Sequence, residues 1–292
     1  MYKQPFAVLL FCLLSNFTFS QHPNATRDYD GNHMLWVNMQ LNGKIKGKFN
    51  YGLDVEMRRQ ADPNHAYEPG DVVGKNNFNI IKNPYQDALR PWIHYQFSDK
   101  IRFSWSPVTW FGTWSFPING KTTYQPELRT SPQITFYQNM GRVQFIQRYR
   151  YEFRFYGVKT LDTHPGNPTG PGDSYDFQGP GRQGRFRYML RMIVPFNKPT
   201  LVKGTLYLMT SEEVFLSMGK NIPSNKLLDQ SRFYFMLGYK FHPEMRLEIG
   251  YLNQTAFRMN NKAKNNVDFN NIVAVNMIFD NLNSLFKKKK TE

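Results

Sequence analysis

The chain has 292 residues, and its 37 Lys and Arg against 22 Asp and Glu give it a formal net charge of +15. Aromatic residues are frequent, at 16%, while the mean hydropathy is low. The one cysteine, Cys12, lies near the amino terminus. The chain beyond it therefore offers no disulfide, no thiol nucleophile and no cysteine metal site.

Residues 1–20 have the pattern of a secretory signal peptide. Lys3 precedes an apolar run from Phe6 to Leu14, and a polar segment ends at Ser20. A membrane-spanning helix needs about 20 apolar residues, so this run is too short to be one. We therefore expect a cleaved signal peptide, one domain over residues 21–286 and a basic tail over residues 287–292.

Export changes the interpretation of the positive net charge. A basic chain often binds nucleic acid, but an exported protein is separated from the nucleic acid of the cell, so we expect no nucleic-acid partner. For a protein of the bacterial outer membrane we expect outer-membrane lipid, lipopolysaccharide, the barrel-assembly machinery and small anionic solutes as partners.

The clearest predicted strand spans residues 141–156. One alternating set of its side chains, including Phe145 and Phe153, is largely aromatic, and the other, including Arg148 and Arg150, is charged. A period of two indicates a β-strand, because successive side chains leave opposite faces. In chain order, strands of this kind are expected at 33–41, 49–59, 88–97, 101–106, 127–138, 141–156, 185–195, 204–216, 230–241, 246–251 and 271–280.

The connections between these strands alternate in length. Short turns such as Asn42-Gly43 join the pairs, and long polar loops are expected at 60–77, 110–126, 157–184, 217–229 and 256–268. This layout is typical of a bacterial outer-membrane barrel. A soluble β-sandwich also alternates, but long strands with a repeated aromatic face and a charged opposite face favour the barrel. The predicted fold is all-β, an antiparallel up-and-down transmembrane β-barrel.

Strand parity sets the expected number of strands. Single-chain bacterial barrels have an even number of strands, and the pattern above gives eleven, so one more is expected. Residues Phe78–Ile81 could supply it, or residues 22–31 could cross as a further strand or run through the lumen. We therefore predict about twelve strands.

Several short segments together resemble an uncharacterised, Bacteroidota-type outer-membrane β-barrel family, a domain of unknown function. In chain order they are Trp36, Glu56–Arg58, Gln147–Glu152, Arg185–Tyr188, Glu213–Phe215, Gln230–Arg232, Gly238–Tyr239 and Gly250–Tyr251. The resemblance covers about residues 33–280. Glu212 and Ser231 depart from it, since Asn is expected at both positions. The resemblance implies the barrel fold, and because the family has no established activity it does not indicate a function.

Catalytic and metal-binding patterns are weak. His94 alone lies mid-strand on a polar face, with Ser104 and Ser106 on the next strand, but a lipid hydrolase would direct its Ser and His toward lipid. We expect His94 to be a hydrogen-bonding residue, and we expect no enzyme activity. His65, His164 and His242 lack metal-ligand spacing, so neither a metal nor a cofactor is expected.

The functional prediction rests on a set of charged side chains that are expected to face the barrel interior. It comprises Asp54, Glu56, Arg58, Glu127, Arg129, Arg148, Arg150, Glu152, Arg154, Arg185, Arg187, Arg191, Glu213 and Arg232. Because guanidinium groups pair well with carboxylates, these residues either satisfy one another or attract an anion. The function expected is an outer-membrane barrel that passes or binds small anionic solutes. Alternatives are a structural or surface-interaction barrel with a closed lumen, an outer-membrane lipid-modifying enzyme and a soluble periplasmic glycan-binding sandwich.

Overall fold

The structure is a computed structural model that describes residues 27–61, 83–114, 124–161, 173–178, 184–219, 227–257 and 265–286. The predicted signal peptide, the tail at 287–292 and the segment Phe78–Ile81 lie outside these residues. The strands are β1 (Arg27–Lys46), β2 (Phe49–Gln60), β3 (Asn83–Ser98), β4 (Ile101–Trp114), β5 (Tyr124–Met140), β6 (Val143–Leu161), β7 (Asp173–Gln178), β8 (Gly184–Pro195), β9 (Thr205–Met218), β10 (Leu228–His242), β11 (Met245–Phe257) and β12 (Asn265–Phe279).

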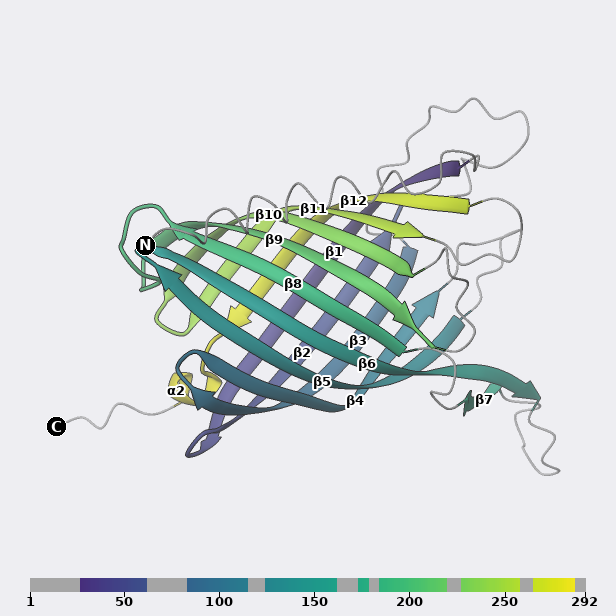
Figure 1. Ribbon diagram of the computed structural model, residues 1–292, viewed down its shortest axis with the longest axis horizontal. Helices are drawn as coiled ribbons and strands as arrows, with labels where there is room; N and C mark the ends of the chain where they lie inside the picture. Colours follow the sequence, from purple (N-terminus) through teal and green to yellow (C-terminus); the bar gives the residue numbers. More distant parts are fainter. Residues whose placement is uncertain are drawn as a thin grey trace.

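The sheet closes on itself, which confirms the predicted all-β barrel. Strands β1–β6 and β8–β12 form the wall, and β5 pairs with β6 to join its two halves. Figure 1 shows these strands tilted and wrapped around a single interior. The short strand β7 pairs only with the far end of β6 and stands outside the wall.

The closing pair differs from the predicted up-and-down arrangement. Strands β1 and β12 are parallel, with Asn38 opposite Asn276 and a 2.8 Å hydrogen bond between their side chains. The sheet has twelve strands, the number predicted, but eleven of them form the wall and the twelfth, β7, lies outside it. A parallel pair lets an odd number of strands close, so no extra crossing is needed. Residues 27–31, considered as a separate strand, are part of β1.

Tight turns gather at one end of the barrel, which we call the short-turn end. They follow β1, β3, β5 and β10, and a longer connection joins β8 to β9 at the same end. The first turn lies at Gly47, whose φ of 58° suits glycine. Asn42 and Gly43, expected to form this turn, lie within β1 opposite β2. The helix α2 (Leu282–Leu285) lies here too, where Asn283 accepts a 3.0 Å hydrogen bond from the Tyr51 hydroxyl.

Two predicted loops are shorter than expected because strands extend into them. Strand β4 continues to Trp114 and β5 begins at Tyr124, so both ends of the 110–126 segment are paired, at residues 110–114 and 124–126. Strand β6 continues through Gly157 to Leu161, where β7 pairs with it. Proline and glycine within these segments led to a loop prediction, but a barrel edge beyond the core accepts both residues.

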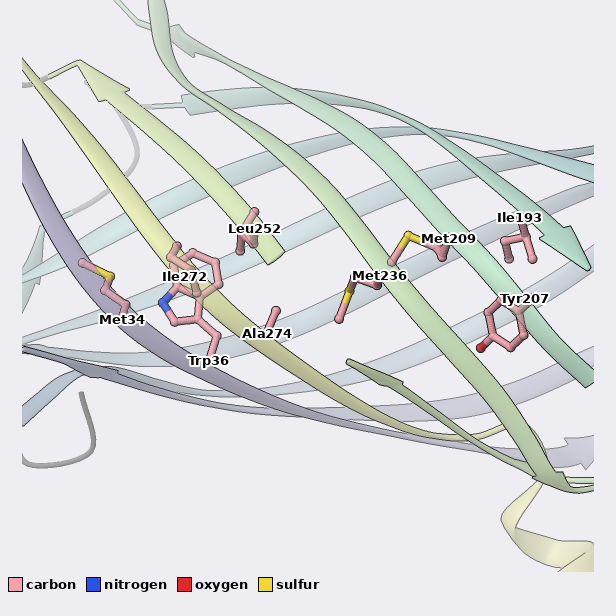
Figure 2. Close-up of a cluster of buried hydrophobic side chains, with 9 residues drawn as sticks. All are labelled: Met34, Trp36, Ile193, Tyr207, Met209, Met236, Leu252, Ile272 and Ala274. Carbon is pink, nitrogen blue, oxygen red and sulfur yellow. The ribbon is translucent and has the colours of Figure 1, made fainter. Parts of the chain in front are cut away.

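The alternating faces of the strands are those predicted. The outer face exposes large apolar side chains on most strands, among them Phe103, Trp105, Phe235 and Leu237. The inner face carries charged side chains on β2–β6 and on β8–β11, for example Glu213 on β9 and Arg232 on β10. On β8–β12 and β1 it also carries an apolar cluster that the sequence analysis did not anticipate. Figure 2 shows this cluster, which comprises Met34, Trp36, Ile193, Tyr207, Met209, Met236, Leu252, Ile272 and Ala274.

In the described residues, no helix has the length and apolar character needed to cross a membrane.

The parallel closure predicts a specific cross-link. Val37 and Val275 are opposite one another across β1 and β12. Neighbouring strands bring such partners to about 4.5–5.5 Å between Cα atoms, which is within disulfide range. In a Cys12→Ser chain, Val37→Cys with Val275→Cys should cross-link under mild oxidation, measured as a gel shift that reductant reverses. Val37→Cys with Phe279→Cys is the control, displaced by about 13 Å along the strand. Cross-linking of the control pair alone would contradict the parallel register.

Candidate functional site: the arginine-rich barrel interior

The structure places the whole predicted charge cluster inside the barrel. Its members line interior cavities or form ion pairs with residues that do, on strands β2, β5, β6, β8, β9 and β10. Period-two alternation explains this placement, since each residue lies on the strand face opposite the aromatic one. The structure then shows which charges meet.

Glu152 on β6 is the centre of the largest ion-pair group. It is 1% exposed. Its Oε2 accepts hydrogen bonds from Arg185 Nη2 at 2.7 Å and Nε at 2.9 Å, and from Arg129 Nη1 at 3.3 Å. Its Oε1 accepts from Arg187 Nη1, and Arg150 Nη1 lies 3.8 Å away. One carboxylate therefore links strands β5, β6 and β8.

Two further carboxylates extend this group. Glu213 Oε1 on β9 accepts from Arg187 Nη2 at 2.8 Å and from Arg148 Nη2 at 2.6 Å. Glu127 on β5 accepts from Arg129 Nε and from Arg154 Nε, each at 2.6 Å. Arg148 and Glu213 are separated by β8 in the sheet, so their contact spans the interior surface.

A second group lies on β2 and β3. Arg90 Nη1 donates to Glu56 Oε1 at 2.9 Å and lies 3.3 Å from Asp54 Oδ2. Glu56 Oε2 also accepts from Arg58. Arg90 was not part of the predicted cluster, although its position in the alternation of the predicted strand 88–97 carries the same signal.

Arg191 and Arg232 are the predicted residues that the structure does not bring to a carboxylate within the described part of the chain. Arg232 donates to the amide oxygens of Gln254 at 2.8 Å and Gln230 at 3.1 Å. Arg191 has a buried Nε atom with no hydrogen-bond partner among the described residues. Arg102 on β4, which the sequence analysis also left out of the cluster, is in the same situation.

Aromatic rings separate the arginines from one another. The guanidinium carbons of Arg187 and Arg232 lie 4.4 and 4.7 Å from the centroid of the Phe215 ring. Arg129 lies 3.7 Å from the centroid of Phe111, and Arg150 lies 4.8 Å from that of Trp92. Cation–π contact favours these positions. It lets basic side chains pack closely where carboxylates are too few.

Three interior cavities lie beside these ion pairs among the described residues. A small one of about 70 Å³ lies at mid-height between Glu56, Arg90, Arg187 and Glu213, and we call this region the waist. A cavity of about 200 Å³, the loop-end chamber, lies on the side of Gln86, Arg154 and Asp229. The largest, about 480 Å³, is the short-turn chamber, bordered by Lys44, Asp280 and Asn281 at the short-turn end.

The short-turn chamber has an excess of basic side chains. Arg102, Arg148, Arg150, Arg191 and Arg246 line it together with Lys44 and His94, and its acidic residues are Asp54 and Asp280. His94 Nδ1 lies 2.8 Å from Ser104 Oγ, at hydrogen-bonding distance. This is the role that the sequence favoured for His94.

Among the described residues, no group of three or more His, Cys, Asp and Glu side chains is placed to hold a metal ion.

Comparison with known proteins gives the family. A family described as "Protein of unknown function (DUF2490)" matches residues 33–265. The chain belongs to this family. The match covers the segments on which the resemblance to an uncharacterised family was based. It does not extend to a Bacteroidota origin, which stays a prediction. No curated protein matches the chain.

Among solved structures, the chain is similar to a mutant of the ferric enterobactin receptor PfeA from Pseudomonas aeruginosa. The two share 9% sequence identity with a TM-score of 0.27, over 78% of this chain and 40% of the receptor chain. The chain thus matches less than half of that receptor's length.

The ion-pair group around Glu152 yields a stability prediction. Glu152→Gln keeps the side-chain shape and removes the charge that Arg129, Arg185 and Arg187 share. Leaving buried partners uncompensated costs about 3–5 kcal/mol, so the free energy of unfolding should fall by about that amount in denaturant titrations of the folded barrel. Glu244→Gln, the same change in the turn after β10, should stay within about 0.5 kcal/mol. Equal losses in the two variants would contradict this role for Glu152.

Proposed function

We propose that this protein resides in the bacterial outer membrane and binds small anionic solutes inside its barrel rather than passing them freely. One observation carries the proposal: a basic chamber of about 480 Å³ lies beside a waist that buried ion pairs fill. A barrel with a through-channel and a barrel with a solid interior would each lack one of these two features.

The outer face supports the membrane location. Exposed aromatic and aliphatic side chains recur around the wall, for example Ile93 on β3, Phe103 on β4, Phe233 on β10 and Ile249 on β11. Soluble monomers rarely expose continuous apolar patches of more than a few hundred Å². The wall strands run from 12 to 20 residues, which is more than the roughly 9–11 that a tilted strand needs to cross a bilayer. An outer surface of this kind is more stable in contact with lipid than in contact with water.

The interior supports anion binding. Low-dielectric walls concentrate the field of the charges that line a cavity, so a basic chamber raises the local concentration of anions. Arginine suits this role, because its planar guanidinium can hold a carboxylate, phosphate or sulfate with two parallel hydrogen bonds. The chamber provides guanidinium groups from β4, β6, β8 and β11.

The waist argues against free passage. Glu152, Glu213 and Arg150 are each at most 3% exposed, and the cavity that Glu213 and Arg150 line at the waist is only about 70 Å³. These pairs also favour a second candidate, a structural barrel with a closed lumen that works through its connecting segments. A structural barrel would not require the excess of basic side chains in the short-turn chamber, so this excess favours anion binding.

The membrane location predicts heat-modifiable behaviour. The mature chain should need detergent to stay in solution. It should also migrate faster on a gel when it is not boiled, because a closed barrel resists unfolding by the gel detergent. A chain that is monodisperse in buffer without detergent would overturn the location.

The closed waist and the basic interior predict binding without conductance. In planar bilayers the protein should show no stable open channel. In detergent it should retain inorganic sulfate in equilibrium dialysis, and retain it better than a sodium ion at the same ionic strength. A steady anion-selective conductance that responds to Arg148→Glu and Arg187→Glu would establish passage instead. Absence of both conductance and sulfate retention would leave the structural barrel.

A further inference from the structure

We infer that the short-turn chamber is the binding site for a small hydroxylated molecule with two or more negative charges, such as a phosphate or sulfate ester of a sugar. The inference rests on the proposed function and specifies both the part of the interior and the class of ligand. It is argued from the charges, the unused donors, the size and the opening of this chamber.

The carboxylates that line the chamber already have hydrogen-bond or ion-pair partners within the protein, whereas some of its basic side chains have no ion-pair partner. Asp54 Oδ2 accepts from Trp92 Nε1 at 2.8 Å and lies 3.3 Å from Arg90 Nη1. Asp280 pairs with Lys240 at 2.7 Å and with Arg246 at 3.4 Å. Arg102 and Arg191 have no carboxylate within ion-pair distance in the described part of the chain. Negative charge from outside the protein would balance them.

Several guanidinium groups of the chamber also have unused hydrogen-bonding capacity. The Nε atoms of Arg102, Arg148, Arg191 and Arg246 and the Nη1 atom of Arg150 are buried and have no hydrogen-bond partner in the described structure. A buried donor without an acceptor costs about 1–3 kcal/mol, and more when it is charged. An oxyanion supplies several acceptor oxygens at once, which a chloride ion does not.

The arginines converge from separate parts of the wall. Arg102 comes from β4, Arg148 and Arg150 from β6, Arg191 from β8 and Arg246 from β11. Donors that surround a cavity in this way match a ligand with charge on several oxygens, or at more than one position. This arrangement favours a doubly charged phosphate or sulfate ester over a simple carboxylate.

The chamber is larger than one oxyanion needs. Its volume of about 480 Å³ lies within the roughly 300–1,000 Å³ typical of small-molecule sites. Between the arginines, the amides of Gln40, Asn50 and Gln144 line the wall, and Trp92 and Ile278 add apolar surface. Amides suit hydroxyl groups, and an apolar face suits the C–H side of a sugar ring.

The opening of the chamber indicates where the ligand enters. Lys44, Asp280 and Asn281 border it at the short-turn end, while the waist closes the opposite side. In outer-membrane barrels the short turns face the periplasm, so the ligand would come from there. Because the chamber opens at an aqueous end and not through the wall, a soluble ester fits it better than a lipid headgroup.

The test is calorimetric titration of the mature chain, folded in detergent, with glucose 1-phosphate, inorganic phosphate, glucose and dihexanoyl phosphatidic acid. Glucose 1-phosphate should bind several-fold more tightly than phosphate, and glucose should not bind measurably. Arg191→Gln and Arg102→Gln should each weaken binding about tenfold or more, since each removes a charge-assisted hydrogen bond. Neither change leaves an ion-paired carboxylate without its partner, so the heat-modifiable fold should persist.

Arg59→Gln is the matched control, because Arg59 pairs with Asp87 at 2.8 Å and lines none of the three cavities. Access is tested in a Cys12→Ser chain. A bulky maleimide on Asn281→Cys should abolish binding, whereas the same reagent on Leu227→Cys, exposed before β10 at the opposite end of the barrel, should not.

Each result bears on the inference separately from the proposed function. If sulfate is retained but glucose 1-phosphate has no advantage over phosphate, or if Arg59→Gln weakens binding as much as Arg191→Gln, this inference fails and the proposed function stands. Tighter binding of dihexanoyl phosphatidic acid would replace the sugar ester with a lipid headgroup. If no anion is retained at all, both fail together.

Discussion

The buried carboxylate of Glu152 is the interaction on which the interior depends. It accepts hydrogen bonds from Arg129, Arg185 and Arg187, which lie on two other strands. A charge buried in this way is tolerated only when it is paired with good geometry. The pairing also fixes strand register, because a slip of one residue would turn Glu152 to the outer face and the apolar residues inward. The same contact therefore stabilises the wall and fills the waist.

Arginines outnumber carboxylates around this centre, and aromatic rings make their close packing possible. Arg58 and Arg232 lie on the Trp36 ring, at 4.1 and 4.9 Å from its centroid, and Phe215 receives further guanidinium groups. Ring faces carry negative electrostatic potential, so one ring can attract two cations. Carboxylates and aromatic rings together therefore hold the guanidinium groups in the interior, although arginines outnumber carboxylates there.

Much of this could be read from the sequence, because strand alternation assigns each side chain to a face without reference to other strands. That rule placed Arg148, Arg187 and Glu213 inside correctly. It could not show that Arg148 meets Glu213 across an intervening strand, nor that β1 and β12 are parallel, since both depend on how the sheet closes. The apolar cluster around Tyr207 and Met236 was missed for a different reason: a polar lumen was assumed on every strand.

The apolar cluster lies beside the ion pairs in the interior. Strands β8–β12 and β1 contribute side chains that need no water, among them Met209 and Ile272, while the largest ion-pair group lies on β5, β6, β8 and β9. A conducting pore requires a continuous polar path, and here part of the circumference is dry and the rest is occupied by paired charges. Arg102 and Arg191, which have no carboxylate partner in the described part of the chain, both line the short-turn chamber. Because charge without a partner is costly in a low-dielectric interior, an anion bound in that chamber, as proposed, would offset the charge of these two arginines.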